Sequence, residues 1–323
     1  MPAAVVHATA LAKAFGDFVA VDGIDLTVEH GECFGMLGPN GAGKTSTMRM
    51  IGCVTPVTSG SLAVLGTDVT GRGAGRRVKA RLGVVPQEDS LDEELTVMEN
   101  LVVYARYFGI GGATARRRAG EQLAFMSLAD RADDKVRTLS GGMKRRLVIA
   151  RALVNDPEVV FLDEPTTGLD PQARHHIWDR LRSLKASGAT LVLTTHYMEE
   201  ASQLCDRLVI MDKGKVLVEG PPRDLVRRHT RRHVVEVPRT VLDSHRLPDF
   251  AGSDVIDLHD RVLVHTDDGP SVLAELERAG VEAEDVYARP ASLEDVFLAL
   301  TGRDLLDAGA SAEVVDAPGG GRS

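Results

Sequence analysis

Short apolar runs alternate with helical patterns through the first two thirds of the chain. Four of these runs have the length of one buried strand, and they lie at residues 33–37, 82–85, 159–162 and 191–193. Turn residues follow each run, and a helix-like spacing of apolar residues usually comes next. This alternation is typical of a mostly parallel sheet covered by helices, so we predict an α/β fold here.

Helix-rich sequence interrupts the alternation at residues 88–138. Thr96 and Glu99 have the spacing of a capping box, which predicts that a helix begins there. Another helix is predicted to begin after Asp170, an N-cap residue followed by proline, and to end at Gly188.

Composition changes near Gly220, where the sequence Gly-Pro-Pro indicates a boundary. Residues 1–220 carry 26 basic and 27 acidic side chains, which gives a net charge of −1. Residues 221–323 carry 12 and 20, which gives −8, and they contain no lysine. The two parts therefore differ in charge, and we expect them to be separate domains.

The second part has its own pattern of elements. Strands are predicted at residues 234–237, 255–258 and 262–264, and helices at residues 272–279 and 293–300. We therefore expect a small α/β or α+β domain at residues 221–307. Residues 308–323 are too small and polar to bury a core, and we expect them to be disordered.

The composition of the whole chain excludes several classes of protein. Apolar residues make up 43% and charged residues 26%, which is ordinary globular usage. No apolar run approaches the roughly 18–20 residues of a membrane-spanning helix. A formal net charge of −9 argues against binding to nucleic acid. Cys33, Cys53 and Cys205 are far apart and odd in number, so we expect free thiols.

The sequence GPNGAGKT at residues 38–45 fits the phosphate-loop pattern GxxxxGK[ST], between a predicted strand and a predicted helix. Its glycines let backbone N–H groups point at a phosphate, and the helix adds the positive end of its dipole. Lys44 is then placed by the β- and γ-phosphates, and Thr45 can give its hydroxyl to Mg²⁺. The alternative is a glycine-rich turn with a solvated lysine. The predicted nucleotide-binding residues are Gly38, Pro39, Asn40, Gly41, Ala42, Gly43, Lys44, Thr45 and Ser46.

Two carboxylates, Asp163 and Glu164, follow the apolar run at residues 159–162. They lie at the predicted carboxyl end of a strand, which is where open α/β sheets bind ligands. Asp163 is therefore a candidate ligand of Mg²⁺, and Glu164 a candidate for polarising the water that attacks the γ-phosphate. The alternative is that both acids cap the next helix.

Further motifs occur in a fixed order. LSGGM at residues 139–143 precedes a predicted helix, Gln87 and His196 each follow a predicted strand, and TTGLD at residues 166–170 follows the acidic pair. With the phosphate loop, these motifs closely resemble the nucleotide-binding subunit of ATP-binding-cassette (ABC) transporters, over residues from about 5 to 220. The resemblance implies a P-loop NTPase cassette that hydrolyses ATP with Mg²⁺, and it makes residues 88–138 the helical subdomain.

The resemblance also implies roles for single residues. Ser140, Gly141 and Gly142 match the signature sequence, which approaches the γ-phosphate bound by the opposite subunit. Gln87 matches the residue that senses Mg²⁺ and the attacking water, and His196 matches the histidine that contacts the γ-phosphate. The expected catalytic residues are Lys44, Gln87, Glu164 and His196, and the expected Mg²⁺ ligands are Thr45, Gln87 and Asp163.

Other positions match less closely or carry alternatives. Asp170 matches the aspartate that links the two sites of the dimer. Phe15 matches the aromatic residue that stacks on adenine, where Tyr is commoner, and the alternative is a buried Phe. Met143 stands where Gln is usual. Lys144, Arg145 and Arg146 are interpreted as solvated surface charges, with a nearby phosphate as the alternative.

Longer strings resemble one branch of the family. GGMKRRL at residues 141–147 and RPASLEDVFLALTGRDL at residues 289–305 are similar to ATPases of nodulation-factor export and daunorubicin resistance. This resemblance implies an exporter subunit that works as a homodimer, with a separate permease, at the cytoplasmic face of the membrane. The permease would recognise the cargo, so the sequence leaves the cargo open.

Two alternatives accompany this reading. Tyr104, Tyr107 and Phe108 cluster in the helical subdomain, where they either contact the permease or pack the core. The second alternative is a soluble ABC-type ATPase without a transport role, which either regulates another process or acts on ribosomes or DNA. Such relatives carry two cassettes or a long coiled coil, and the acidic second domain also disfavours nucleic acid.

Overall fold

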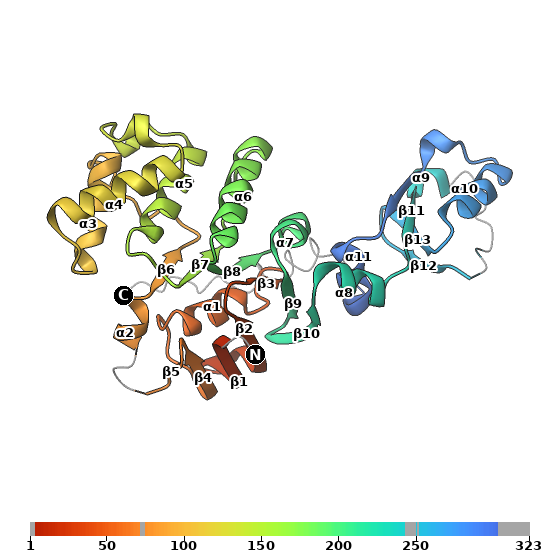
Figure 1. The fold of residues 1–323 in the computed structure, drawn as a ribbon. Coiled ribbons are helices and arrows are strands. Elements are labelled where there is room, and N and C mark those ends of the chain that lie inside the picture. Colours follow the sequence, from red (N-terminus) through yellow and green to blue (C-terminus); the bar gives the residue numbers. More distant parts are fainter. Residues whose placement is uncertain (1–3, 72–74, 243–249, 251, 303–323) are drawn as a thin grey trace, which may run out of the picture. The chain divides into compact units, whose positions relative to one another are not determined.

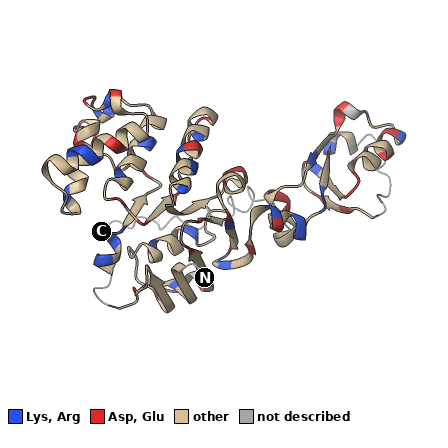
Figure 2. Ribbon diagram, in the orientation of Figure 1, with Lys and Arg blue, Asp and Glu red and all other residues tan. Residues whose placement is uncertain are grey.

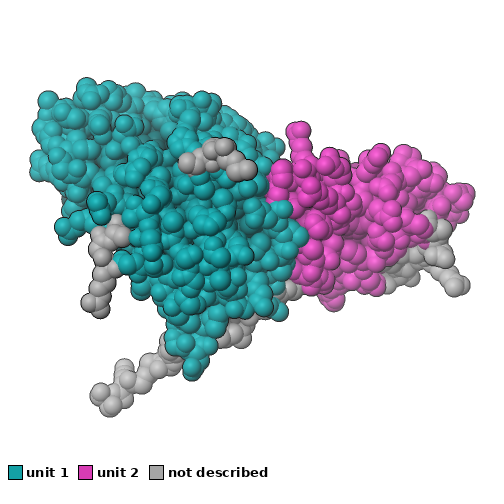
Figure 3. Space-filling model, turned by 60° about the horizontal axis from the view of Figure 1, so that its bottom comes forward, with its two compact units in different colours: residues 1–219, 309–323 teal, residues 220–308 magenta. Residues whose placement is uncertain are grey.

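The computed structural model describes residues 4–71, 75–242, 250 and 252–302 (Figure 1). The chain divides between Glu219 and Gly220 into two compact units (Figure 3). The tail predicted to be disordered, residues 308–323, lies outside the described residues.

A six-stranded sheet with the order β10-β9-β3-β8-β7-β6 forms the centre of the first unit. Its strands are β3 (Cys33–Leu37), β6 (Leu82–Val85), β7 (Val159–Asp163), β8 (Thr190–Thr195), β9 (Arg207–Asp212) and β10 (Lys215–Gly220). The pairs β3–β8, β3–β9, β7–β8 and β6–β7 are parallel. Every residue of β3, β7 and β8 is buried, which confirms that the apolar runs form the strands of an α/β fold.

A second sheet in this unit is antiparallel and was not among the predicted elements. It has the order β2-β1-β4-β5, with β1 (Ala4–Phe15), β2 (Phe18–Glu29), β4 (Ser59–Val64) and β5 (Thr67–Asp68). Ile24, Leu26 and Val28 are buried on one face of β2, so an alternating signal was present in the sequence. This face packs with α1 (Lys44–Ile51) in one apolar core.

The helices α3 (Val97–Tyr107), α4 (Gly112–Phe125) and α5 (Gly141–Leu153) pack together in the yellow to yellow-green part of Figure 1. The capping box of α3 is confirmed, because the Glu99 N–H donates to Thr96 Oγ1 and the Thr96 N–H donates to Glu99 Oε2. Asp170 caps α6 (Pro171–Ala186), as predicted. The unit also contains α2 (Gly75–Lys79), α7 (Met198–Leu204) and the short 3-10 helices η1 (Ala129–Arg131) and η2 (Val136–Thr138).

The second unit is a four-stranded antiparallel sheet with the order β12-β13-β11-β14. One face packs against α10 and the other against α11, so the sheet has two apolar cores. The elements are α8 (Pro222–His229), β11 (His233–Pro238), α9 (Arg239–Leu242), β12 (Asp254–Asp257), β13 (Arg261–Thr266), α10 (Gly269–Arg278), η3 (Ala283–Asp285), β14 (Tyr287–Pro290) and α11 (Leu293–Thr301). Among the described residues, no helix of either unit has the length and apolar character that crossing a membrane requires.

Candidate active site

The topology of the central sheet brings the predicted residues to one edge. Because β3, β6, β7 and β8 are parallel, their carboxyl ends lie at the same edge. The phosphate loop follows β3, Gln87 follows β6, Asp163 ends β7 and His196 follows β8. Residues far apart in the sequence therefore meet at this edge.

The phosphate loop is shaped by Gly43 and occupied by the side chain of Lys44. Gly43 precedes α1 with a φ of 99°, and a Cβ there would lie 2.5 Å from the carbonyl oxygen of Ala20, so only glycine fits. Lys44 is 4% exposed, and its Nζ donates to the carbonyls of Gly38 at 2.7 Å and Pro39 at 2.9 Å. The alternative of a solvated lysine is therefore wrong. Burial lowers the pKa of Lys44, although the acidic pair opposes the shift.

Oxygen atoms gather around the carboxylate of Asp163. Thr45 Oγ1 donates to Asp163 Oδ1 at 3.2 Å, and the Thr194 hydroxyl donates to the same oxygen. Hydroxyl and carboxylate oxygens are the donors that Mg²⁺ prefers, so these residues fit that ion. The acids do not cap the next helix, because α6 takes its cap from Asp170.

Glu164 has a left-handed backbone, with a φ of 46°. Such a conformation costs a residue other than glycine about 1–3 kcal/mol and is often found at functional sites. Its N–H donates to both the carbonyl and the hydroxyl of Thr194 at 3.1 Å. Its carbonyl accepts from Arg145 Nη2 at 3.1 Å. Both sides of the strained residue are therefore held by the surrounding structure.

The carboxylate of Glu164 lies close to three polar side chains, two of which were predicted site residues. Gln87 Nε2 donates to Glu164 Oε2 at 3.4 Å, Thr167 Oγ1 donates to the same oxygen at 3.0 Å, and His196 Nδ1 lies 3.2 Å from Oε1. Burial raises the pKa of Glu164, but contact with His196 and the charge of Lys44 outweigh it, so the pKa lies below its usual value. The carboxylate is therefore ionised at neutral pH and can accept a proton.

The signature residues line a different groove. Ser140 caps α5 through a 3.3 Å bond from the Met143 N–H, and Asp170 accepts a 2.8 Å bond from the Ala173 N–H. Ser140, Gly141, Gly142 and Asp170 line this groove of about 520 Å³. No residue of the phosphate loop is among its described lining residues. One chain thus carries two separate sets of predicted nucleotide contacts.

Phe15 lies at the end of β1 and is 52% exposed, so the alternative of a buried Phe is wrong. The Lys13 ammonium lies 4.7 Å from the centre of its ring. One face of the ring is thereby fixed by a cation–π contact, which leaves a preformed aromatic surface.

Two functional candidates were missed or misread from the sequence. Arg145 was expected to be a solvated charge, which is wrong, because its side chain is buried and donates to backbone carbonyls. Glu200 on α7 is fully buried and bonded to Thr166 and Trp178. The only sequence signal for Glu200 is its place one turn before the buried Leu204 on the same helix.

Comparisons with known proteins agree with this geometry. The family model described as ABC transporter matches residues 21–167. Nod factor export ATP-binding protein I of Burkholderia pseudomallei is 49% identical over 298 residues, which cover 91% of this chain and 96% of that protein. The protein of the same name from Ralstonia nicotianae is 46% identical over 302 residues, with 92% and 94% covered.

Solved structures resemble about two thirds of this chain. The cbiO1 protein of Clostridium perfringens, part of the ABC transporter complex cbiONQ, has a TM-score of 0.64 at 26% identity and covers 69% of this chain and 90% of its own. An ATP-binding cassette solved as a dimer with ADP and phosphate has a TM-score of 0.61 at 28% identity, with 67% and 98% covered. The chain therefore belongs to the ABC transporter family, as an ATP-binding subunit of exporter type with ATPase activity.

Proposed function

We propose that this chain works as a homodimer whose two composite ATP sites drive export through a separate membrane permease. The observation that carries the proposal is the separation of the two sets of contacts within one chain. Lys44, Glu164 and His196 meet at the sheet edge, whereas Ser140 and Asp170 line another groove. A second copy, placed head to tail, would complete each site.

At the sheet edge, each side chain has a role that its position allows. Glu164 accepts the proton of the attacking water, and its low pKa keeps it ready to do so. Lys44 exchanges its bonds to the loop carbonyls for the β- and γ-phosphates, and His196 donates to the γ-phosphate. Phe15 stacks on adenine. Thr45, Asp163 and Gln87 would hold Mg²⁺, which neutralises phosphate charge when bound.

The signature groove supplies the partner's site. The Ser140 hydroxyl and the N–H groups of Gly141 and Gly142 lie at the start of α5, a helix of 13 residues. A helix N-terminus attracts anions through its free N–H groups and its dipole, so this end would bind the γ-phosphate of the second subunit.

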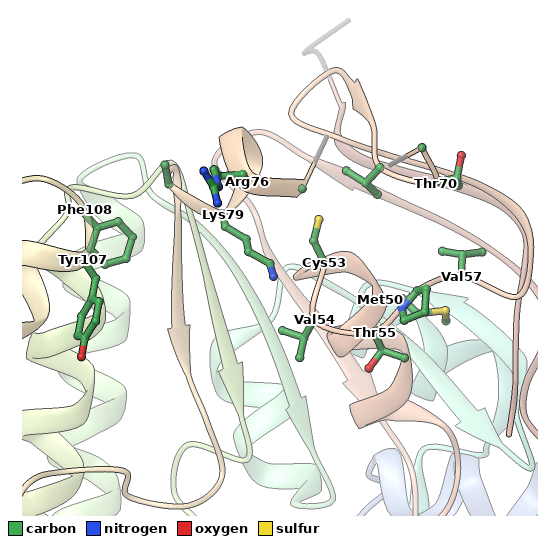
Figure 4. Close-up of a pocket in the computed structure, with 15 residues that line it drawn as sticks. Met50, Cys53, Val54, Thr55, Val57, Thr70, Arg76, Lys79, Tyr107 and Phe108 are labelled. Atoms are coloured by element: carbon green, nitrogen blue, oxygen red, sulfur yellow. The ribbon is translucent and has the colours of Figure 1, made fainter. Parts of the chain in front are cut away.

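A second groove in the first unit is our candidate for permease docking. It has a volume of about 880 Å³, and Figure 4 shows Tyr107 and Phe108 on one side, with Arg76 and Lys79 of the basic helix α2 and Val54 facing them. Tyr107 is 81% exposed, whereas Tyr104 is half-buried against both aromatic neighbours. Tyr104 therefore packs the subdomain, and Tyr107 is left for a partner helix. The basic residues of α2, blue on the ribbon of Figure 2, suit an acidic or C-terminal helix end.

We extend the proposal to the chain's organisation and place of action. Residues 1–220 are the nucleotide-binding domain, and residues 221–307 a small exporter-type domain. The chain acts at the cytoplasmic face of the membrane, which it reaches through the permease. The tight pair between Arg289 and Asp295, within the exporter-type string, supports an ordered second domain, because their bonds of 2.7 and 2.9 Å join a half-buried guanidinium to a buried carboxylate.

The test of composite sites is the Glu164→Gln variant. It keeps the shape of the side chain but removes the base, so we expect ATP binding to persist, the dimer to accumulate and turnover to be lost. Size-exclusion chromatography with ATP and phosphate release measure the two effects. Glu121→Gln, on the exposed face of α4, is the control and is expected to behave as wild type. Equal hydrolysis by Glu164→Gln would remove Glu164 from its role.

Co-purification tests the membrane partner. The chain is expected to be recovered from membranes with a multispanning protein, and Tyr107→Arg is expected to weaken that recovery without changing ATP affinity. Val255→Arg alters another exposed hydrophobic position, in the second unit, and serves as the control. Recovery with ribosomes or DNA would contradict the transport function.

A further inference from the structure

Arg145 is a buried cation on the first turns of α5, one turn after the signature residues. The residue is 4% exposed. Burial lowers the pKa of its guanidinium, with Asp89, 3.5 Å from Nη1, acting in the opposite direction. A cation in this position needs compensating acceptors, because an unpaired buried charge is strongly destabilising.

The compensation comes from main-chain carbonyls of two loops at the sheet edge. A guanidinium has five N–H donors, and here each has a backbone acceptor within reach. Nε donates to Pro165 at 2.7 Å, Nη1 to Pro86 at 2.6 Å and Gln87 at 3.2 Å, and Nη2 to Asp163 at 3.0 Å and Glu164 at 3.1 Å. One planar group therefore joins the start of α5 to the loop of Gln87 and to the acidic pair.

The bond to Glu164 bears directly on catalysis. Glu164 has the left-handed φ of 46°, and its carbonyl is one of the two acceptors of Arg145 Nη2. The bond to that carbonyl restrains the strained backbone from which the Glu164 side chain projects. The carbonyl of Gln87, whose amide donates to Glu164 Oε2, is held by the same guanidinium.

The neighbouring Arg146 gives the contrast. It follows Arg145 on the same helix and is only partly buried, and its Nη1 donates to the carbonyls of Met126 and Ser127 at 2.9 and 3.2 Å. Both acceptors lie beside α4, within the helical subdomain. Arg146 thus stabilises the subdomain without contact to the catalytic loops.

We propose that Arg145 is a positioning residue that couples the signature end of α5 to the geometry of Glu164 and Gln87 in the same chain. A helix moves as a rigid unit over one turn, so a shift of residues 140–142 on the partner's nucleotide carries the guanidinium with it. Binding of ATP at one site would then change the geometry of the catalytic residues at the other site. This inference rests on the proposed composite sites.

The experiment compares Arg145→Lys, Arg145→Gln and the control Arg146→Lys in full-length protein. Wild type is expected to hydrolyse ATP with a Hill coefficient above 1. Arg145→Gln, which keeps only two N–H donors, is expected to lower kcat at least about tenfold, with KM within about threefold and a Hill coefficient near 1. Arg145→Lys, with three donors and the charge, is expected to lie between the two, and Arg146→Lys to stay within about twofold of wild type.

A second readout does not depend on turnover. On ATP addition, amide hydrogen exchange at residues 86–89 and 163–168 is expected to slow in wild type and in Arg146→Lys but not in Arg145→Gln. The proposed coupling would be overturned if Arg145→Gln had the same kcat, the same Hill coefficient and the same ATP-dependent slowing of amide exchange as wild type. If thermal denaturation shows that Arg145→Gln is unfolded, the same kinetic and hydrogen-exchange measurements on Arg145→Lys test the coupling. Absence of hydrolysis in wild type would instead count against the proposed function.

Discussion

The Thr166 hydroxyl donates a 2.7 Å hydrogen bond to the fully buried carboxylate of Glu200. The same carboxylate oxygen accepts a 3.1 Å bond from Trp178 Nε1. One acid on α7 thus joins the loop that follows Glu164 to the middle of α6. Burial raises the pKa of Glu200, and the hydrogen bonds from Thr166, Thr195 and Trp178 only partly oppose that shift.

The raised pKa makes stability depend on pH through Glu200. The contribution of a carboxyl with a raised pKa is fully present below its usual value of 4.5 and is lost as the pH rises through the folded value. Wild type should lose about 1.4 kcal/mol per pH unit in that window. Glu200→Gln removes this slope, whereas the exposed control Glu199→Gln keeps it. The measurement is the free energy of unfolding as a function of pH. The same pH dependence in wild type and in Glu200→Gln would contradict the prediction.

Alanine substitutions at the two signature glycines should affect subunit stability differently but should both reduce ATP turnover. A Cβ at Gly141 meets no atom within 4 Å, so Gly141→Ala should leave subunit stability within about 0.5 kcal/mol. A Cβ at Gly142 would lie 3.0 Å from that of Ala173, so Gly142→Ala should cost about 1–3 kcal/mol. Both should reduce ATP turnover, because the added methyl group blocks approach to the partner's phosphate. Thermal unfolding without nucleotide, followed by ATPase assays, measures both effects, and equal stability of the two variants would refute the distinction.

Removal of the Phe15 ring should weaken binding of the adenine base only. Stacking on an aromatic ring is worth about 1–3 kcal/mol, so Phe15→Ala should raise the Kd for ATP at least about fivefold. Phe15→Tyr keeps the ring and should bind ATP like wild type. Inorganic tripolyphosphate has no base, so its affinity should be the same in all three proteins. An equal loss of tripolyphosphate affinity would mean that Phe15 supports the loop and not the base.

His196→Ala should change both the rate and its pH dependence. Loss of one donor to the γ-phosphate is expected to reduce kcat about 100-fold or more. Because His196 and Lys44 hold the pKa of Glu164 below its usual 4.5 against burial, removing His196 lets that pKa rise. The acid limb of the kcat profile should therefore move to higher pH. His175→Ala, at an exposed position on α6, is the control, and an unmoved acid limb in His196→Ala would show that His196 does not tune Glu164.

Short sequence motifs correctly predicted the helix caps, which depend only on neighbouring residues. The capping box of Thr96 and Glu99 and the cap of Asp170 act within four residues, and both occur as predicted. The antiparallel sheet of β1, β2 and β4 was missed although Leu26 and Val28 alternate with less buried residues and β1 and β2 are neighbours in the sequence; only the third strand, β4, comes from far along the chain. Arg145 was misread as well. From the sequence, a cation near the start of a helix is expected to be solvated, because the distant carbonyls that bind it become visible only in the folded structure.

The sequence by itself determined which chemical groups are available and where each stands on its own element. A glycine-rich loop after a buried strand, two acids at a strand end and a capped signature helix follow from short-range sterics and hydrogen bonding. The tertiary structure decided which of these groups meet. The parallel register of β3, β6, β7 and β8 brings Gln87 and His196 to Glu164 but leaves Ser140 in another groove. Buried groups such as Arg145 and Glu200 acquire their partners only from distant segments, because a charge removed from water must find them there.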